Sequence, residues 1–176
     1  MKPGTTVKLV YTGTLDDGTV FGVATEEQPM EFQTGMDLTI PGFEKEILEM
    51  SEVGEERTFT VNCYDAYGEY HEEFIQEVPK ENIPMSVKVG KRIWMFDDDG
   101  NKFPVTVMEV KDQTVVFDMN HPLAGKDLTF NVKILELQDA PENFVTAAEK
   151  QQELDRQAQL LGINNGQEGG ANTIML

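Results

Sequence analysis

The sequence predicts an α+β fold in which short antiparallel strands surround one short helix, with a second small β unit inserted late in the first. Three observations predict it. Apolar and polar residues alternate in short runs over most of the first 70 residues, one segment among them has helical spacing, and a separate group of strand-like runs begins near Glu72. At 176 residues the chain is long enough for one large domain or two small ones.

The elements expected in the first 70 residues follow from alternation and turn signals. Strands are expected at 7–11, 19–21, 30–33 and 57–62. Asp17-Gly18 marks the turn after the first strand, because glycine readily adopts a positive φ. A helix is expected to begin at Pro41 and to stop before Gly54, with apolar residues at helical spacing: Phe43, Ile47, Leu48 and Met50.

The later elements form a second group. A helical turn is expected at 79–82, and strands at 92–96, 103–110 and 114–118, with a last strand at 128–137. Thr146 and Glu149 form a possible capping box for a helix within 141–161, and the Gly- and Asn-rich end from Gly162 is expected to be disordered. We therefore predict a discontinuous domain at 1–70 and 121–140, an inserted domain at 71–120 and a tail at 141–176.

The composition excludes several classes of protein. A formal net charge of −18 would repel phosphate backbones and anionic lipid surfaces, so neither nucleic acid nor membrane is an expected partner. No apolar run approaches the ~20 residues of a membrane span, and the start of the chain lacks the apolar run of a signal peptide. The single cysteine, Cys63, fits a reducing compartment, and we expect it to be a buried strand thiol. The sequence thus predicts a cytoplasmic protein.

No metal site is expected. His71 and His121 are the only histidines and lie fifty residues apart, whereas a structural site needs about four well-spaced ligands. The run Asp97-Asp98-Asp99-Gly100-Asn101 lacks the 12-residue pattern of a calcium loop, so we interpret it as a hairpin turn. His121 is expected to support the junction between the two domains.

Four segments carry motifs. They are Tyr11 to Phe21 (YTGTLDDGTVF), Ile40 to Glu44 (IPGFE), Asp65 to Gly68 (DAYG) and Asn120 to Lys126 (NHPLAGK). In this order and spacing they resemble the FKBP family over roughly residues 5 to 138. The fourth motif, preceded by an insert of about 50 residues, resembles the SlyD-type branch, which carries an insert-in-flap domain at this place.

The resemblance implies a bent antiparallel sheet wrapped on one short helix, with an aromatic pocket that binds a prolyl residue. Carried over by motif, the catalytic residues are Tyr11, Phe21, Met30, Ile40, Phe43, Tyr67 and Phe130. Alternation alone would assign these side chains to the core, and the order of the motifs assigns them to a pocket. For Phe32, core and pocket stay equally open.

The chain departs from the family pattern at three places. Gly22 stands where the family usually has an Asp that organises the tyrosine hydroxyls. Phe43 stands where Trp is common, or Leu in the SlyD branch, and keeps an apolar floor. The tail contains neither His nor Cys, so the metal handling associated with the SlyD branch does not carry over. No cofactor is expected, because rotation about a prolyl bond requires no nucleophile, metal or proton shuttle.

The insert is rich in apolar residues for its size. We expect about half of them to form a small core and the rest to bind clients, with candidates Ile83, Met85, Trp94, Phe96, Phe103 and Val105. The alternative is that all of them pack internally.

The function predicted is a peptidyl-prolyl cis-trans isomerase that assists protein folding, with chaperone activity in the insert. Its expected partners are unfolded or nascent polypeptides and their X-Pro segments, and we expect a monomer. The alternative, favoured by Gly22, is a holdase or adaptor with an inactive FKBP body.

Overall fold

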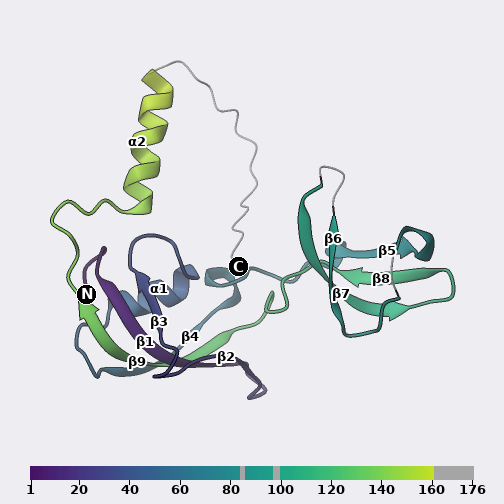
Figure 1. Ribbon diagram of the computed structural model, residues 1–176, viewed down its shortest axis with the longest axis horizontal. Coiled ribbons are helices and arrows are strands. Elements are labelled where there is room, and N and C mark those ends of the chain that lie inside the picture. The colour runs from purple at the N-terminus through teal and green to yellow at the C-terminus, as the bar shows by residue number, and fades with distance from the viewer. Residues whose placement is uncertain (84–85, 97–99, 161–176) are drawn as a thin grey trace. The chain divides into compact units, whose positions relative to one another are not determined.

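The computed structural model describes residues 1–83, 86–96 and 100–160 (Figure 1). The described chain divides into two compact units. The first comprises Met1–Ala66 and the residues from Lys126 onward, and the second comprises Tyr67–Gly125. Three expectations concern residues outside the described ranges: Met85, the turn at 97–99, and the predicted disorder from Gly162.

The first unit is an antiparallel sheet. Its strands are β1 (Thr6–Thr14), β2 (Val20–Ala24), β3 (Met30–Gln33), β4 (Glu56–Val61) and β9 (Leu128–Gln138). They lie in the order β2-β1-β9-β4, with β3 also paired to β1. Strands β2 and β3 both pair with the same edge of β1: β3 pairs with the first half of β1, and β2 pairs with its second half. The strand that comes last in the chain, β9, therefore lies inside the sheet, between β1 and β4.

Helix α1 (Pro41–Leu48) packs on the face of the sheet formed by β4 and β9. Proline opens the helix, where its missing N–H and fixed φ cause no loss. The helix buries Phe43 and Ile47 against inward residues of the strands, which alternate as the sequence predicted. The buried apolar side chains of this unit include Val7, Leu9, Ile47, Met50, Leu128, Val132 and Ile134.

The second unit is a four-stranded antiparallel sheet. Its strands are β5 (Ile75–Pro79), β6 (Arg92–Phe96), β7 (Lys102–Val110) and β8 (Thr114–Asp118), in the order β5-β8-β7-β6. Short 3-10 turns flank β5 at Glu72–Phe74 and Lys80–Asn82. The core consists of Val105, Val107, Val115 and Phe117. Alternation along β6 turns Ile93 and Met95 toward this core and leaves Trp94 and Phe96 exposed.

The predicted α+β class is confirmed, and two details differ. Strand β5 has no counterpart among the predicted strands, because only Ile75 and Val78 are apolar and Pro79 follows. Proline is tolerated there because β5 is an edge strand of its sheet. Cys63 was expected to be a buried strand thiol, which is wrong. It is half-buried and begins a 3-10 turn, Cys63–Asp65, where its backbone N–H donates to the Asp127 carboxylate at 3.0 Å.

Helix α2 (Ala147–Leu160) is the last element of the part of the chain that the structure describes. The predicted capping box is present, since the Glu149 N–H donates to Thr146 Oγ1 and the Thr146 N–H donates to the Glu149 carboxylate. This hydrogen bonding lowers the pKa of Glu149. Neither helix of the described chain combines the length and the apolar character that a bilayer span needs.

Glu44 connects α1 to the preceding loop. Its side chain is buried, 7% exposed, and its carboxylate accepts a hydrogen bond from the Gly35 N–H. Burial raises the pKa of Glu44 and the charge of Asp37 acts in the same direction, while the Gly35 hydrogen bond opposes them. The folded protein therefore binds the Glu44 proton more tightly than the unfolded chain does.

We expect this group to make stability pH-dependent. Its contribution is fully present below the ordinary pKa of 4.5 and is lost as the pH rises through the raised folded pKa. Urea unfolding of wild type and Glu44→Gln should show wild type losing free energy of unfolding, relative to the variant, as the pH rises from about 4.5. The exposed Glu49→Gln controls for removal of one charge. A pH-independent difference between wild type and Glu44→Gln would contradict the assignment.

Candidate active site

A cluster of aromatic rings fills the space between α1 and the sheet of the first unit. Phe43, on α1, lies at its centre: its ring centroid is 4.8 Å from that of Phe130, in an edge-to-face arrangement. Tyr11 and Phe59 lie 6.1 and 5.7 Å from Phe43. Phe32 lies 6.2 Å from it, so this residue joins the cluster through Phe43. Edge contacts of this kind stabilise by about 0.5–1.5 kcal/mol each beyond the area they bury.

Phe130, on β9, is the second centre of the cluster. Its ring centroid lies 5.8 Å from Tyr11, 5.5 Å from Phe21 and 5.7 Å from Phe59. Phe43 and Phe130 are buried, at 2% and 5% exposure, whereas Tyr11, Phe21 and Phe59 are only half-buried. The cluster thus has a buried base and rings that reach solvent, which is what an apolar binding surface requires.

The strands bring these rings together through their register. Gly13 pairs with Phe130 across β1 and β9, and Phe59 pairs with Phe130 across β4 and β9, so all three positions share one face of the sheet. The glycine is necessary for the packing, because a Cβ at position 13 would lie 2.5 Å from Cζ of Phe21. Without a side chain there, the Phe21 ring can pack edge-on against Phe130.

The other predicted site residues fall at different places. Ile40 is buried and is the last residue before α1, and Met30 is half-buried at the start of β3, paired with Leu9. Tyr67 lies in the second unit, where its ring stacks on that of His121 at 3.8 Å. Six of the seven predicted residues therefore belong to the first unit, and four of them are members of the ring cluster.

Phe59 was missed in the prediction from sequence. Its place on β4, two residues from the buried Val61, was a usable signal, because alternation puts both side chains on the inward face. Phe59 was not predicted because none of the four family motifs includes it.

Gly22 faces the hydroxyl of Tyr11. A Cβ at position 22 would lie 3.1 Å from Tyr11 Oη, a close but adjustable contact with the end of a side chain. A short polar side chain here would therefore meet the tyrosine hydroxyl, which is the role that the family pattern assigns to the usual Asp.

Four of the predicted client-binding residues of the second unit divide into three groups by exposure. Trp94 and Phe96 are 58% and 65% exposed, and Lys102 Nζ lies 4.6 Å from the Trp94 ring centroid. Phe103 is partly buried against the core. Val105 is 1% exposed, so its side chain is part of the core and is not available to a client. This corrects the expectation for Val105.

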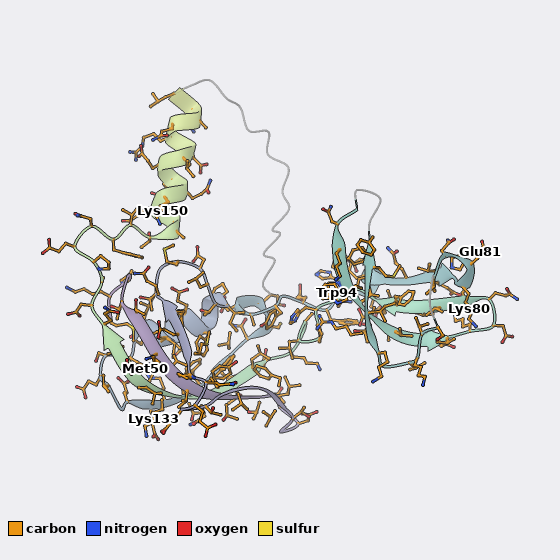
Figure 2. The ribbon with its side chains drawn as sticks, in the orientation of Figure 1. Met50, Lys80, Glu81, Trp94, Lys133 and Lys150 are labelled. Atoms are coloured by element: carbon orange, nitrogen blue, oxygen red, sulfur yellow. The ribbon has the colours of Figure 1, made fainter. Side chains whose placement is uncertain are left out.

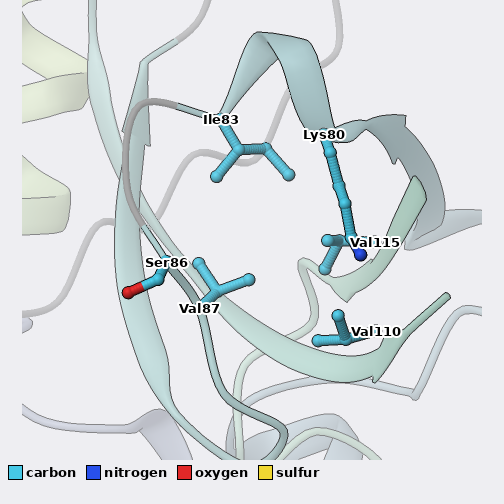
Figure 3. A pocket seen from close by; sticks show the side chains of 6 residues that line it. All are labelled: Lys80, Ile83, Ser86, Val87, Val110 and Val115. Atoms are coloured by element: carbon cyan, nitrogen blue, oxygen red, sulfur yellow. The ribbon is translucent and has the colours of Figure 1, made fainter. Parts of the chain in front are cut away.

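Ile83 lines a cavity of about 340 Å³ in the second unit (Figure 3). Its walls are mostly apolar, with one ammonium and one hydroxyl group, and the lining residues are Lys80, Ile83, Ser86, Val87, Val110 and Val115. The volume suits one large apolar side chain.

Within the part of the chain that the structure describes, neither histidine belongs to a group of three or more His, Cys, Asp or Glu side chains that could hold an ion. Nδ1 of His121 accepts a hydrogen bond from the Leu123 N–H, and burial together with the Arg92 cation lowers the pKa of His121. This places the proton of the neutral ring on Nε2.

An antiparallel sheet packed on one helix around a cluster of aromatic rings defines the class of the first unit, that of prolyl isomerases of the FKBP type. Residues 1–135 match the family of FKBP-type peptidyl-prolyl cis-trans isomerases, and the chain belongs to this family.

The chain is similar to proteins named FKBP-type peptidyl-prolyl cis-trans isomerase SlyD. It is 35% identical to that of Vibrio cholerae over 147 residues, covering 82% of this chain and 72% of the relative. Identity to the protein of Escherichia coli K12 is 36%, over 77% of this chain and 69% of the relative. Identity to that of Treponema pallidum is 34%, over 80% of both. The predicted SlyD-type resemblance is confirmed.

Substitution of one residue of the ring cluster tests whether the cluster is the active site. Phe130→Leu keeps an apolar side chain but loses the edge contacts, and we expect kcat/KM for an X-Pro tetrapeptide to fall about tenfold, or ~1.4 kcal/mol. Phe117→Leu is the matched control, because Phe117 is equally buried in the core of the second unit. Full activity of folded Phe130→Leu would place the site elsewhere.

Substitutions at Gly22 provide a second test, which concerns the alignment of this position with the family pattern. Gly22→Asp should leave kcat/KM equal or higher, because its carboxylate can orient the Tyr11 hydroxyl. Gly22→Ala introduces the same Cβ without the carboxylate and is the control for crowding at 3.1 Å. An Asp variant less active than the Ala variant would contradict the alignment of this position with the family pattern.

Proposed function

We propose that the aromatic cluster is the prolyl site of this isomerase and that the second unit binds unfolded clients for it. The observation that carries the proposal is the graded burial of the cluster. Phe43 and Phe130 form a dry base, while Tyr11, Phe21 and Phe59 reach the surface where a peptide can contact them. Ile40 and Met30, which lie in the same unit, remain proposed members of this site, and Tyr67 remains a proposed catalytic residue.

The chemistry suits a site made of apolar rings. Rotation about an X-Pro bond faces a barrier of about 18–20 kcal/mol, because resonance gives the C–N bond partial double-bond character. Twisting the bond removes this resonance and reduces the charge separation of the amide. An apolar surface therefore disfavours the planar, polar ground state relative to the twisted transition state.

The acceleration required is modest. A gain of a hundred- to ten-thousandfold corresponds to about 3–5.5 kcal/mol. Burying the proline ring among aromatic rings supplies energy of this order, since a buried apolar side chain is stabilised by about 1.5–3 kcal/mol. Part of this binding energy must be available only to the twisted state for the rate to rise.

Client binding by the second unit is supported by two surfaces. Trp94 and Phe96 project from β6, which is an edge strand, so an extended segment can pair with its backbone beside two exposed aromatic side chains. The cavity beside Ile83 can take an apolar side chain of the client. Exposed aromatic side chains on an edge strand would otherwise favour aggregation, and a role in binding clients explains why they are exposed.

The two activities complement each other. A client held by the second unit stays near the prolyl site, which raises the effective concentration of its prolines there. We propose that this division follows the predicted domains, with isomerisation in 1–70 and 121–140 and capture in 71–120. We further propose that the protein works as a monomer in the cytoplasm, a compartment that suits its single free cysteine.

The alternative of an inactive FKBP body rests on Gly22 alone. The comparison of Gly22→Asp with wild type addresses it directly, since an inactive body would give no peptide turnover in wild type.

The division of labour can be tested with surface variants. Trp94→Ser combined with Phe96→Ser should lower catalysis of a proline-limited refolding reaction at least tenfold, because the client is no longer held. Activity on a tetrapeptide should change less than about threefold. Val53→Ser, in the first unit and 61% exposed, is the matched control. Equal loss in the two assays would contradict the proposal, because it would show that these residues shape the prolyl site itself.

A further inference from the structure

The segment before helix α2 packs against the N-terminal residues and the loop that precedes α1. The Phe144 ring covers two glycines: a Cβ at Gly4 would lie 2.5 Å from its Cγ, and a Cβ at Gly35 would lie 3.4 Å from its Cε1. Both glycines have positive φ, +91° and +80°. Bare backbone at Gly4 therefore admits the ring, which also lies at contact distance from Gly35.

Gly35 is held from two sides. Its C=O accepts a hydrogen bond from the Ala147 N–H, the first residue of α2, at 2.7 Å. Its N–H donates to the carboxylate of Glu44 on α1. The sulfur of the next residue, Met36, lies 4.0 Å from Nζ of Lys150. Lys150 lies in the first turn of α2 (Figure 2). Contacts from α1 and α2 thus meet on one short stretch of the loop.

The loop leads directly into the proposed prolyl site. It begins at Thr34, which is tied to the N-terminal segment by backbone hydrogen bonds to Gly4 and Thr5, and it ends at Ile40. Between them Asp37 has a φ of +52°, which is uncommon for non-glycine residues although Asp adopts it more readily than most. Thr39 Oγ1 is buried without a hydrogen-bond partner among the described residues. These local features give the loop little stability of its own, so contacts from neighbouring segments help to hold it.

We propose that residues 144–150 act as a clamp that positions the loop from Gly35 to Ile40 for catalysis. Ala147 and Phe144 are positioning residues, because they act through their contacts with the loop and the N-terminal segment. The inference rests on the proposed function, in which Ile40 and Phe43 line the prolyl site. Releasing the clamp lowers the fraction of molecules with the loop in its competent arrangement, which weakens apparent substrate binding in proportion.

Ala147→Pro removes the clamp hydrogen bond selectively. Proline lacks the N–H, yet it suits the first position of a helix, where no intrahelical acceptor is needed. The preceding residue, Thr146, is the capping residue, and the extended backbone of a capping residue is compatible with a following proline. Ala147→Gly keeps the N–H and is the matched control.

We expect Ala147→Pro to raise KM for an X-Pro tetrapeptide about two- to tenfold, the range that corresponds to one hydrogen bond, with kcat retained. Hydrogen exchange of the Gly35 amide should accelerate in the same variant. Phe144→Ala in the full chain, which removes the ring that lies against Gly4, should also raise KM. This variant carries the test should Ala147→Pro fail to fold, as judged by circular dichroism.

Three results would overturn the proposal. An unchanged KM with faster Gly35 exchange would show that the loop is released without consequence for catalysis. A fall in kcat at constant KM would indicate loss of folded enzyme, which is a merely structural effect. An equal rise in KM for Ala147→Gly would show that the hydrogen bond is not the cause. The Phe130→Leu variant tests the proposed prolyl site separately, because this substitution leaves the clamp contacts intact.

Discussion

The pairing of β4 with β9 is the constraint on which the rest of the chain depends. Val61 pairs with Leu128, so the stretch between them leaves the sheet and returns to it at adjacent positions. The Cys63 N–H donates to Asp127 just beyond this pair, which extends the closure. Within the second unit, Gly125 donates to Gly68, and His71 and Asn120 exchange two hydrogen bonds. An insert whose ends are brought together in this way adds little loop-closure entropy to the folding of the first unit.

The same strand pairing builds the ring cluster. β9 supplies Phe130 and β4 supplies Phe59, and only their alignment across the sheet puts both rings against Phe43 on α1. A buried base made in this way serves two purposes, because the rings that hold the helix to the sheet are also the base of the proposed prolyl site. Stability and binding are therefore coupled here, and conservative substitutions are more informative than truncations to alanine, which leave cavities.

Glycines in the first unit determine how closely neighbouring aromatic rings approach the backbone. At position 13 the missing side chain admits the Phe21 ring, and at position 4 it admits the Phe144 ring. Gly35 also connects Glu44, on α1, with Ala147, at the start of α2. The C-terminal segment is thus part of the packing of the first unit, although its sequence looks like a separate helical tail. The loop before α1 is where packing from both helices meets.

Local pattern by itself determined the α+β class, most strand positions, the start of α1 at Pro41 and the capping box at Thr146. Each of these depends on neighbours in the chain: alternation, the fixed φ of proline, or a hydrogen bond across three residues. Motif order determined the family and named Tyr11, Phe21, Phe43 and Phe130. Tertiary structure alone decided that Phe59 completes the ring cluster, that Val105 is core while Trp94 and Phe96 are exposed, and that Phe144 covers Gly4 and Gly35. Those outcomes depend on which separate segments of the chain pack together, and no local pattern of one sequence specifies such a contact.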